Sequence, residues 1–146
     1  MIWLFYAIAA SLCWGMSYAA SGPILRKGLS PHLFFFGYSA LGFLGSLVLI
    51  SATGKIGQAF RMEGLEKGDI GWFLFSIGGS ALGAFLTYAA MSAKNPTLAS
   101  LIEISYPLFV ILFAWLFFRE MQLNPMTICG GLLVIAGVAV IILGER

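Results

Sequence analysis

Five long apolar stretches constrain this chain more than any other feature of its sequence. They lie at about residues 2–21, 33–53, 70–93, 96–118 and 126–143. Each is close to the ~20 residues that a helix needs to cross about 30 Å of hydrocarbon. Lipid offers no partner for loose backbone groups, and the stretches are too long for the strands of a membrane barrel. They predict an all-α membrane protein, with five transmembrane helices forming one domain over residues 1–146.

Composition agrees with a lipid surrounding and excludes several other classes of protein. Of the 146 residues, 60% are hydrophobic and 10% are charged, whereas a soluble domain carries roughly 25% charged residues. The formal net charge of +2 and the lack of a basic cluster argue against a nucleic-acid partner. We therefore expect an integral membrane protein of the cell (plasma or inner) membrane, with the lipid bilayer as its surrounding partner.

Side chains that carry catalytic or metal-binding chemistry are few. Cys13 and Cys129 lie inside apolar stretches at no metal or redox spacing, and the lone His32 has no neighbouring ligand. The sequence contains no nucleotide-binding loop, no paired catalytic carboxylates and no Ser/His/Asp set. We therefore expect no enzymatic activity, no bound metal and no cofactor.

The charges of the connecting segments do not select an orientation for the predicted helices. Five spans place four cations at each membrane face: Lys55, Arg61, Lys67 and Arg119 on the face of the N-terminus, and Arg26, Lys27, Lys94 and Arg146 on the other. Orientation is normally set by an excess of Lys and Arg in short loops on one side. Either the chain inserts both ways, or a partner chain determines its orientation, or some of these cations carry less weight than others.

Several short motifs occur in an order that resembles a known transporter family. "CWGMSYAASGPIL" (13–25) contains a Trp-Gly pair, and "TYAAMSAKNPTLAS" (87–100) contains a Tyr-Ala junction. Residues 95–142 combine small residues, a mid-helix proline, a glutamate that closes the fourth span and glycines in the last span. This order resembles the EamA-like module of the drug/metabolite transporter superfamily. The resemblance implies a solute transporter fold that is built from five-helix repeats.

The chain departs from that family pattern in carrying one repeat. Most relatives have two repeats in one polypeptide, whereas these 146 residues show no internal duplication. Transporters of this kind commonly place the substrate site between two repeats of opposite topology. The resemblance therefore implies a second copy, which is either the same chain in an antiparallel homodimer or a sibling five-helix chain.

Glu103 is a carboxylate inside the fourth apolar stretch, and Pro107 follows it by four residues. In a helix the N–H of residue 107 bonds the carbonyl of residue 103, but proline has no N–H. The sequence therefore predicts a helix kink at Pro107 and a freed carbonyl on the residue that also carries the carboxylate. Ser100 and Tyr106, three residues to either side, share its helix face.

Depth in the membrane brings residues of other spans to the level of Glu103. At 1.5 Å per residue, Glu103 lies roughly 9–10 Å inside its own membrane face. Trp14, Tyr18 and Thr87 fall at similar levels. With Glu103 and Tyr106, they form a candidate substrate- or proton-binding cavity.

Two interpretations of Glu103 remain open. In the first, it faces a water-filled path, exchanges a proton and competes with or recruits a cationic substrate, since ionisable residues within spans mark pathways by default. In the second, it stays protonated and serves a structural role by hydrogen-bonding Tyr106 or a neighbouring helix, or by meeting Lys94 near the interface.

Glycines on two spans have the spacing of helix contacts. Gly79 and Gly83 are four residues apart, which lets helices approach closely. Gly130, Gly137 and Gly144 recur every seven residues on the last span. We expect Gly79, Gly83, Gly130 and Gly137 to serve helix or subunit packing.

Two functions fit these observations. The leading one is a secondary transporter of a small organic metabolite or drug-like solute, acting as a dimer of five-helix repeats and coupled to protons through Glu103. The alternative is a membrane subunit that does not transport and instead assembles with or regulates a partner membrane protein.

Overall fold

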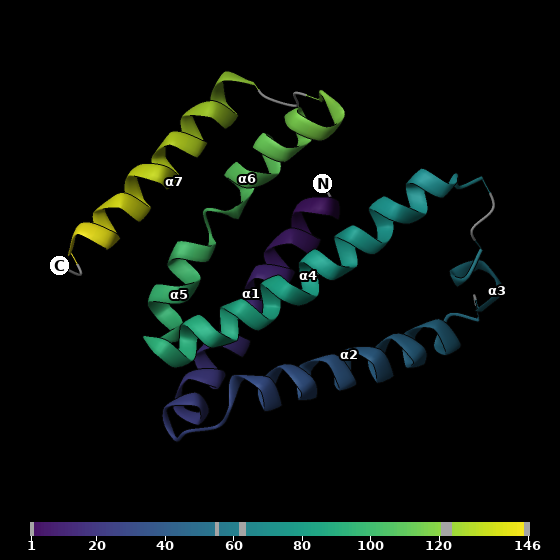
Figure 1. Cartoon of the computed structure of the whole chain (residues 1–146), viewed down its shortest axis with the longest axis horizontal. Helices are drawn as coiled ribbons and strands as arrows, with labels where there is room; N and C mark the ends of the chain where they lie inside the picture. Colours follow the sequence, from purple (N-terminus) through teal and green to yellow (C-terminus); the bar gives the residue numbers. More distant parts are fainter. Residues whose placement is uncertain (1, 55, 62–63, 121–123, 145–146) are drawn as a thin grey trace. The chain divides into compact units, whose positions relative to one another are not determined.

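The computed structural model of the chain describes residues 2–54, 56–61, 64–120 and 124–144. Throughout these ranges the regular structure is helical (Figure 1). The helices are α1 (Ile2–Arg26), α2 (Pro31–Ala52), α3 (Ile56–Ala59), α4 (Lys67–Ala93), α5 (Pro96–Glu103), α6 (Tyr106–Phe113), the π-helical turn η1 (Ala114–Phe118) and α7 (Pro125–Gly144).

Five of these helical segments are long and apolar enough to cross a membrane. The fourth consists of α5, α6 and η1 together and covers Pro96–Phe118. The predicted fold class is therefore confirmed. The chain is an all-α integral membrane protein with five candidate membrane spans.

Some of the observed helices extend a few residues beyond the spans expected from the sequence. The first span was expected to end near residue 21, but α1 continues through Pro23 to Arg26. The third was expected to begin at 70, but α4 begins at Lys67. A span can extend beyond its most apolar stretch, because helical geometry continues into the interface until a residue or a cap ends it.

Three helices begin with the same local device, a capping side chain followed by proline. Ser30 precedes Pro31 of α2, and its hydroxyl accepts a hydrogen bond from the His32 N–H at 3.2 Å. Asn95 precedes Pro96 of α5 in the same way. Its side-chain oxygen accepts from the Leu98 N–H at 2.8 Å.

The third case is the start of α7. The side-chain oxygen of Asn124 accepts from the Thr127 N–H at 2.8 Å, directly before Pro125. Proline is favoured at the first helical position because its missing N–H would have no partner there. The fourth and fifth spans were expected to begin at about residues 96 and 126, and the corresponding helices begin at Pro96 and Pro125.

The chain divides into two compact units. One comprises Met1–Gly22 and Ala93–Arg146, and the other comprises Pro23–Ser92. In the second unit, aromatic side chains of α2 meet α4. Phe34 lies 4.6 Å and Tyr38 lies 6.1 Å from Tyr88, measured between ring centroids, and Tyr88 is buried. This cluster joins the start of α2 to the last third of α4.

In the first unit, the two halves of the fourth span contact α7. α5 packs against α7. A Cβ atom added to Gly131 of α7 would lie 3.1 Å from a methyl carbon of Leu108 on α6. Gly131 is therefore a point of close approach between α6 and α7.

The glycines that the sequence indicated for packing have no such neighbour in the described part of the chain. A Cβ atom at Gly79, Gly83, Gly130 or Gly137 would meet no heavy atom within 4 Å. The prediction of helix packing at these positions therefore stays a prediction.

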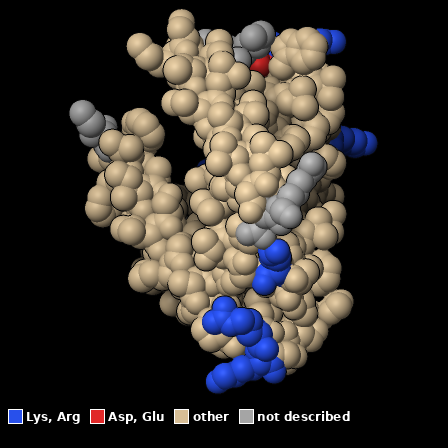
Figure 2. All heavy atoms as spheres, turned by 90° about the vertical axis from the view of Figure 1, so that its left-hand side faces the viewer, with Lys and Arg blue, Asp and Glu red and all other residues tan. Residues whose placement is uncertain are grey.

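The spans leave most of their apolar side chains exposed on the single chain. On α7, Leu132, Leu133 and Val140 are all more than 60% exposed. Uncharged side chains make up most of the face drawn in Figure 2. A soluble domain rarely exposes so many apolar side chains together. Their exposure here suits a surface that lipid or another apolar helix covers.

Candidate functional site

The candidate site is built around a break in the fourth span. α5 ends at Glu103, and α6 begins at Tyr106 with Pro107 in its first turn. On the two sides of Ser105, tight turns replace the α-helical bonds. The Ser105 N–H donates to the Ile102 carbonyl at 3.1 Å, and the Leu108 N–H donates to the Ser105 carbonyl at 3.0 Å. Pro107 has no N–H to donate to the carbonyl of Glu103, so the α-helical hydrogen bond between these two residues is missing at the break.

The break places Glu103 at the C-terminal end of one short helix, next to the start of another. Carbonyl groups at a helix C-terminus carry a partial negative charge, which favours cations. Irregular backbone at membrane depth is tolerated where it lies within protein or lines a cavity. The break at residues 104 and 105 meets that condition, since Glu103, Ile104 and Tyr106 all line a pocket.

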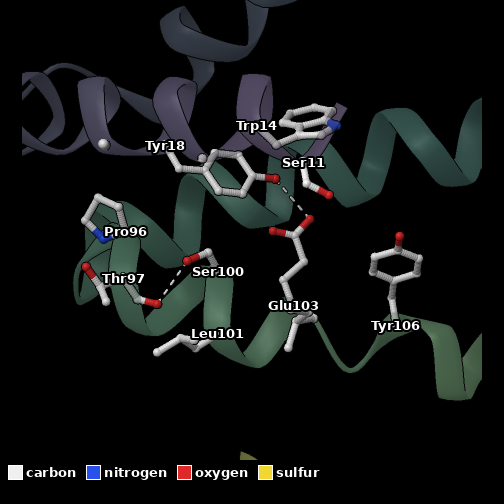
Figure 3. A pocket seen from close by; sticks show the side chains of 12 residues that line it. Ser11, Trp14, Tyr18, Pro96, Thr97, Ser100, Leu101, Glu103 and Tyr106 are labelled. Atoms are coloured by element: carbon white, nitrogen blue, oxygen red, sulfur yellow. Dashed lines mark hydrogen bonds between the residues drawn. The ribbon is translucent and has the colours of Figure 1, made fainter. Parts of the chain in front are cut away.

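The pocket lies within the first unit and has a volume of about 600 Å³, within the range of small-molecule sites. α1 supplies one wall, and the fourth span supplies the other (Figure 3). The lining residues are Ser11, Trp14, Gly15, Tyr18, Ala19, Pro96, Thr97, Ser100, Leu101, Glu103, Ile104 and Tyr106.

The side chain of Glu103 extends from α5 toward α1, where Tyr18 and Trp14 lie (Figure 3). The Tyr18 hydroxyl donates a hydrogen bond to Oε1 of Glu103 at 3.1 Å. The second carboxylate oxygen, Oε2, is buried and has no hydrogen-bond partner in the described part of the chain. A buried acceptor without a donor costs free energy, so Oε2 is the atom of this pocket that most requires a partner.

Two aromatic rings stand beside the carboxylate. Trp14 and Tyr18 are one helical turn apart on α1, and their ring centroids are 5.4 Å apart at a tilt of 48°. Tyr18 and Glu103 are half-buried, whereas Trp14 is 43% exposed. Tyr106 stands across the break on α6 and is 61% exposed.

Four of the five residues predicted to form the cavity line this pocket: Trp14, Tyr18, Glu103 and Tyr106. Thr87, the fifth, is half-buried on α4 and belongs to the second unit. Whether any of these residues binds a solute or a proton stays a prediction.

Ser11, Pro96 and Thr97 also line the pocket, although none of them was predicted from the sequence. Two of them could have been found from their helical spacing to residues that were predicted. Ser11 lies three residues before Trp14 and seven before Tyr18, so the three share a face of α1. Thr97 lies three residues before Ser100, which in turn lies three before Glu103.

The described residues lack a clustered set of metal ligands. Residues 2–54, 56–61, 64–120 and 124–144 contain no group of three or more His, Cys, Asp or Glu side chains arranged to hold a metal ion. The pocket instead offers a carboxylate, aromatic faces and hydroxyl oxygens.

A comparison with protein families gives a match over almost the whole chain. The model of the EamA-like transporter family matches residues 1–143. No curated protein and no solved structure matches the chain.

Proposed function

Since the chain belongs to the EamA-like transporter family, we propose that it is a secondary transporter of a small organic metabolite or drug-like solute. The observation that carries this proposal is the carboxylate of Glu103, which stands in a pocket at a helix break inside a membrane span. Ionisable residues in such positions are costly, and they mark substrate or ion pathways.

The same carboxylate supports coupling to protons. Oε1 is held by the Tyr18 hydroxyl, and Oε2 has no partner in the described part of the chain. A carboxyl group in this state can accept a proton on Oε2 while Tyr18 keeps its orientation. In our proposal, Glu103 gains a proton on one side of the membrane and releases it on the other, and the bound solute changes which state is favoured.

We further propose that two five-helix repeats form the working unit in the cell membrane. The chain carries one repeat, and its eight Lys and Arg residues divide four against four between the faces predicted for the loops. An antiparallel pair of identical chains needs no excess of cations on one face. The open glycines on α7 and its exposed apolar side chains give such a pair a surface at which to meet.

Transport is tested with the purified full-length chain in lipid vesicles under a pH gradient, using a panel of amines, amino acids and nucleosides. We expect at least one solute to drive a proton flux. Glu103→Gln keeps the shape of the side chain but cannot titrate, so its solute-dependent proton flux should fall to the level of protein-free vesicles. Glu66→Gln changes an exposed glutamate that precedes α4, and it should retain the wild-type flux.

Two results would count against parts of this proposal. Unchanged pH-dependent uptake in Glu103→Gln would assign Glu103 a structural role and remove the coupling mechanism. If no solute of the panel is taken up, even when a sibling five-helix chain is added, the chain is instead a subunit that assembles with a partner membrane protein.

A further inference from the structure

Most polar groups of the pocket face it as hydrogen-bond acceptors, because their own protons are already used. The Ser11 hydroxyl donates to the Ala7 carbonyl one turn back, at 3.0 Å. The Ser100 hydroxyl donates to the Thr97 carbonyl, also at 3.0 Å. The Tyr18 hydroxyl donates to Glu103. The hydroxyl oxygens of Ser11 and Ser100 keep lone pairs with which they can accept a bond from a solute.

Oε2 of Glu103 adds a stronger acceptor. It is buried and without a hydrogen-bond partner among the described residues. Hydrogen bonds to an ionised carboxylate are roughly twice as strong as neutral ones. A solute that brings a donor to Oε2 therefore gains that bond and relieves the cost of the unpaired oxygen. A solute without a donor leaves the cost in place.

The charge of the pocket favours a cation. Its lining residues, all within the described ranges, include one carboxylate and no Lys, Arg or His side chain. The faces of Trp14 and Tyr18 attract positive charge. α5 ends at Glu103, and the carbonyl groups at its C-terminus add a partial negative charge to the pocket.

Polar donors are nevertheless not absent from the pocket. Among the described hydrogen bonds, none uses the hydroxyl proton of Thr97 or of Tyr106. Both lie at the margins of the lining, Thr97 in the first turn of α5 and Tyr106 beyond the break. These hydroxyls can bind a second polar group of a solute, but they do not supply a donor to Oε2.

We propose that this pocket selects solutes with a protonated amine that still carries an N–H, namely primary to tertiary ammonium groups on an apolar body, and rejects quaternary ammonium groups. The inference rests on the proposed function and specifies its substrate class. The N–H donates to Oε2, the charge is balanced by Glu103, and the apolar body lies against Trp14 and Leu101.

A methylation series tests the role of the N–H separately from charge and size. The probes are 2-phenylethylammonium, its N,N-dimethyl and N,N,N-trimethyl derivatives, and neutral 2-phenylethanol. Binding is measured by titration calorimetry on the purified full-length chain in detergent. The dimethyl and trimethyl compounds have the same charge and differ by one methyl group, but only the dimethyl compound has an N–H.

We expect the first two compounds to bind with dissociation constants within about threefold of each other. The trimethyl compound and the alcohol should bind at least about tenfold more weakly than the dimethyl compound, as expected when a buried acceptor loses its donor. In Glu103→Gln the ratio of the trimethyl to the dimethyl dissociation constant should fall toward one, while Glu66→Gln should keep the wild-type ratio. If Glu103→Gln does not fold, the inference is judged on the ratio of the trimethyl to the dimethyl dissociation constant in the unmodified chain.

The outcomes separate this inference from the proposed function. Equal affinity for the dimethyl and trimethyl compounds overturns the inference, and uptake of either compound into vesicles still supports transport. If no ammonium compound binds while vesicles take up a neutral or anionic solute, the inference is wrong and the transporter stands. If nothing binds and nothing is taken up, both are wrong.

Discussion

Tyr18 is the residue through which α1 acts on Glu103. Its hydroxyl is the one described donor to the carboxylate, and its own ring is held beside Trp14. The role we assign to it is positioning. With Oε1 occupied by Tyr18, Oε2 is the carboxylate oxygen that is left for a further partner.

Replacing Tyr18 with phenylalanine keeps the ring and removes the donor. Oε1 then loses its partner and the carboxylate is free to rotate. We expect the dissociation constant of a bound solute to rise about three- to tenfold, measured by titration calorimetry. Tyr6→Phe is the matched control, because Tyr6 is 67% exposed near the start of α1. Equal affinities in Tyr18→Phe and the unmodified chain would remove the positioning role.

For single residues, the sequence predicted which side chains lie at the same depth in the membrane, but not the direction in which each one points. Depth follows from the 1.5 Å rise of a helix, and it was enough to select Trp14, Tyr18 and Glu103, which the structure places on one pocket. The rotation of each helix about its axis depends on packing between spans, which an almost uniformly apolar surface does not reveal. Ser11 was missed for that reason. Thr87, which was also selected on depth, lies in the other unit, and its place in the cavity stays a prediction.

Among the helical elements, the two prolines inside spans behave differently. Pro23 lies inside α1, and the helix continues past it to Arg26. Pro107 lies in the first turn of α6, after a two-residue break. Either outcome is open to a proline in a membrane span, because neighbouring groups can satisfy the freed carbonyl. Length and hydropathy therefore predicted the five spans well, whereas the form of the break at residues 104 and 105 required the structure.

The contact between α6 and α7 leads to a prediction about stability. A Cβ atom at Gly131 would lie 3.1 Å from a methyl carbon of Leu108, whereas one at Gly130 would meet nothing within 4 Å. Gly131→Val should lower the free energy of unfolding by about 1 kcal/mol or more, as overpacking does. Leu108→Ala removes the obstructing methyl groups, so the double variant should lose less than the sum of the two single variants.

The measurement is unfolding in mixed detergent micelles, with Gly130→Val as the control. Gly130 is one of the glycines of α7 that are predicted to contact a second chain. A high detergent-to-protein ratio is therefore used, because it keeps the chain monomeric and removes that contact from the measurement. We expect Gly130→Val to change the free energy of unfolding by less than Gly131→Val does. Equal effects at the two glycines, or additive effects of Gly131→Val and Leu108→Ala, would contradict the close approach of α6 and α7.

For the whole molecule, family membership and the number of spans were readable from sequence because both depend on long-range order along the chain. Motifs spread over five apolar stretches indicated the EamA-like module, and the family model matches residues 1–143. The arrangement of a second repeat is a different kind of property. It depends on how the chain inserts and on which surfaces meet in the membrane, and neither is encoded in a local pattern.

Orientation is the property of the whole chain that the loop charges do address. Four cations on each predicted face leave no preference by the positive-inside rule. Two C-terminal reporters, one active only in the cytoplasm and one active only on the opposite side, should therefore give signals of comparable strength. Removing one cation should tip this balance. Lys67→Gln leaves the C-terminal face with the excess and should move the C-terminus to the cytoplasmic side. Lys27→Gln, the same change on the other face, should move the N-terminus there.

The opposite directions of these two shifts make the test specific to charge. A general effect on folding or expression would alter both variants alike, whereas the charge balance requires them to move apart. A C-terminal signal confined to one side in the unmodified chain, and unaffected by Lys67→Gln and Lys27→Gln, would exclude dual insertion. It would also exclude the antiparallel homodimer, which needs both orientations of the same chain in one membrane.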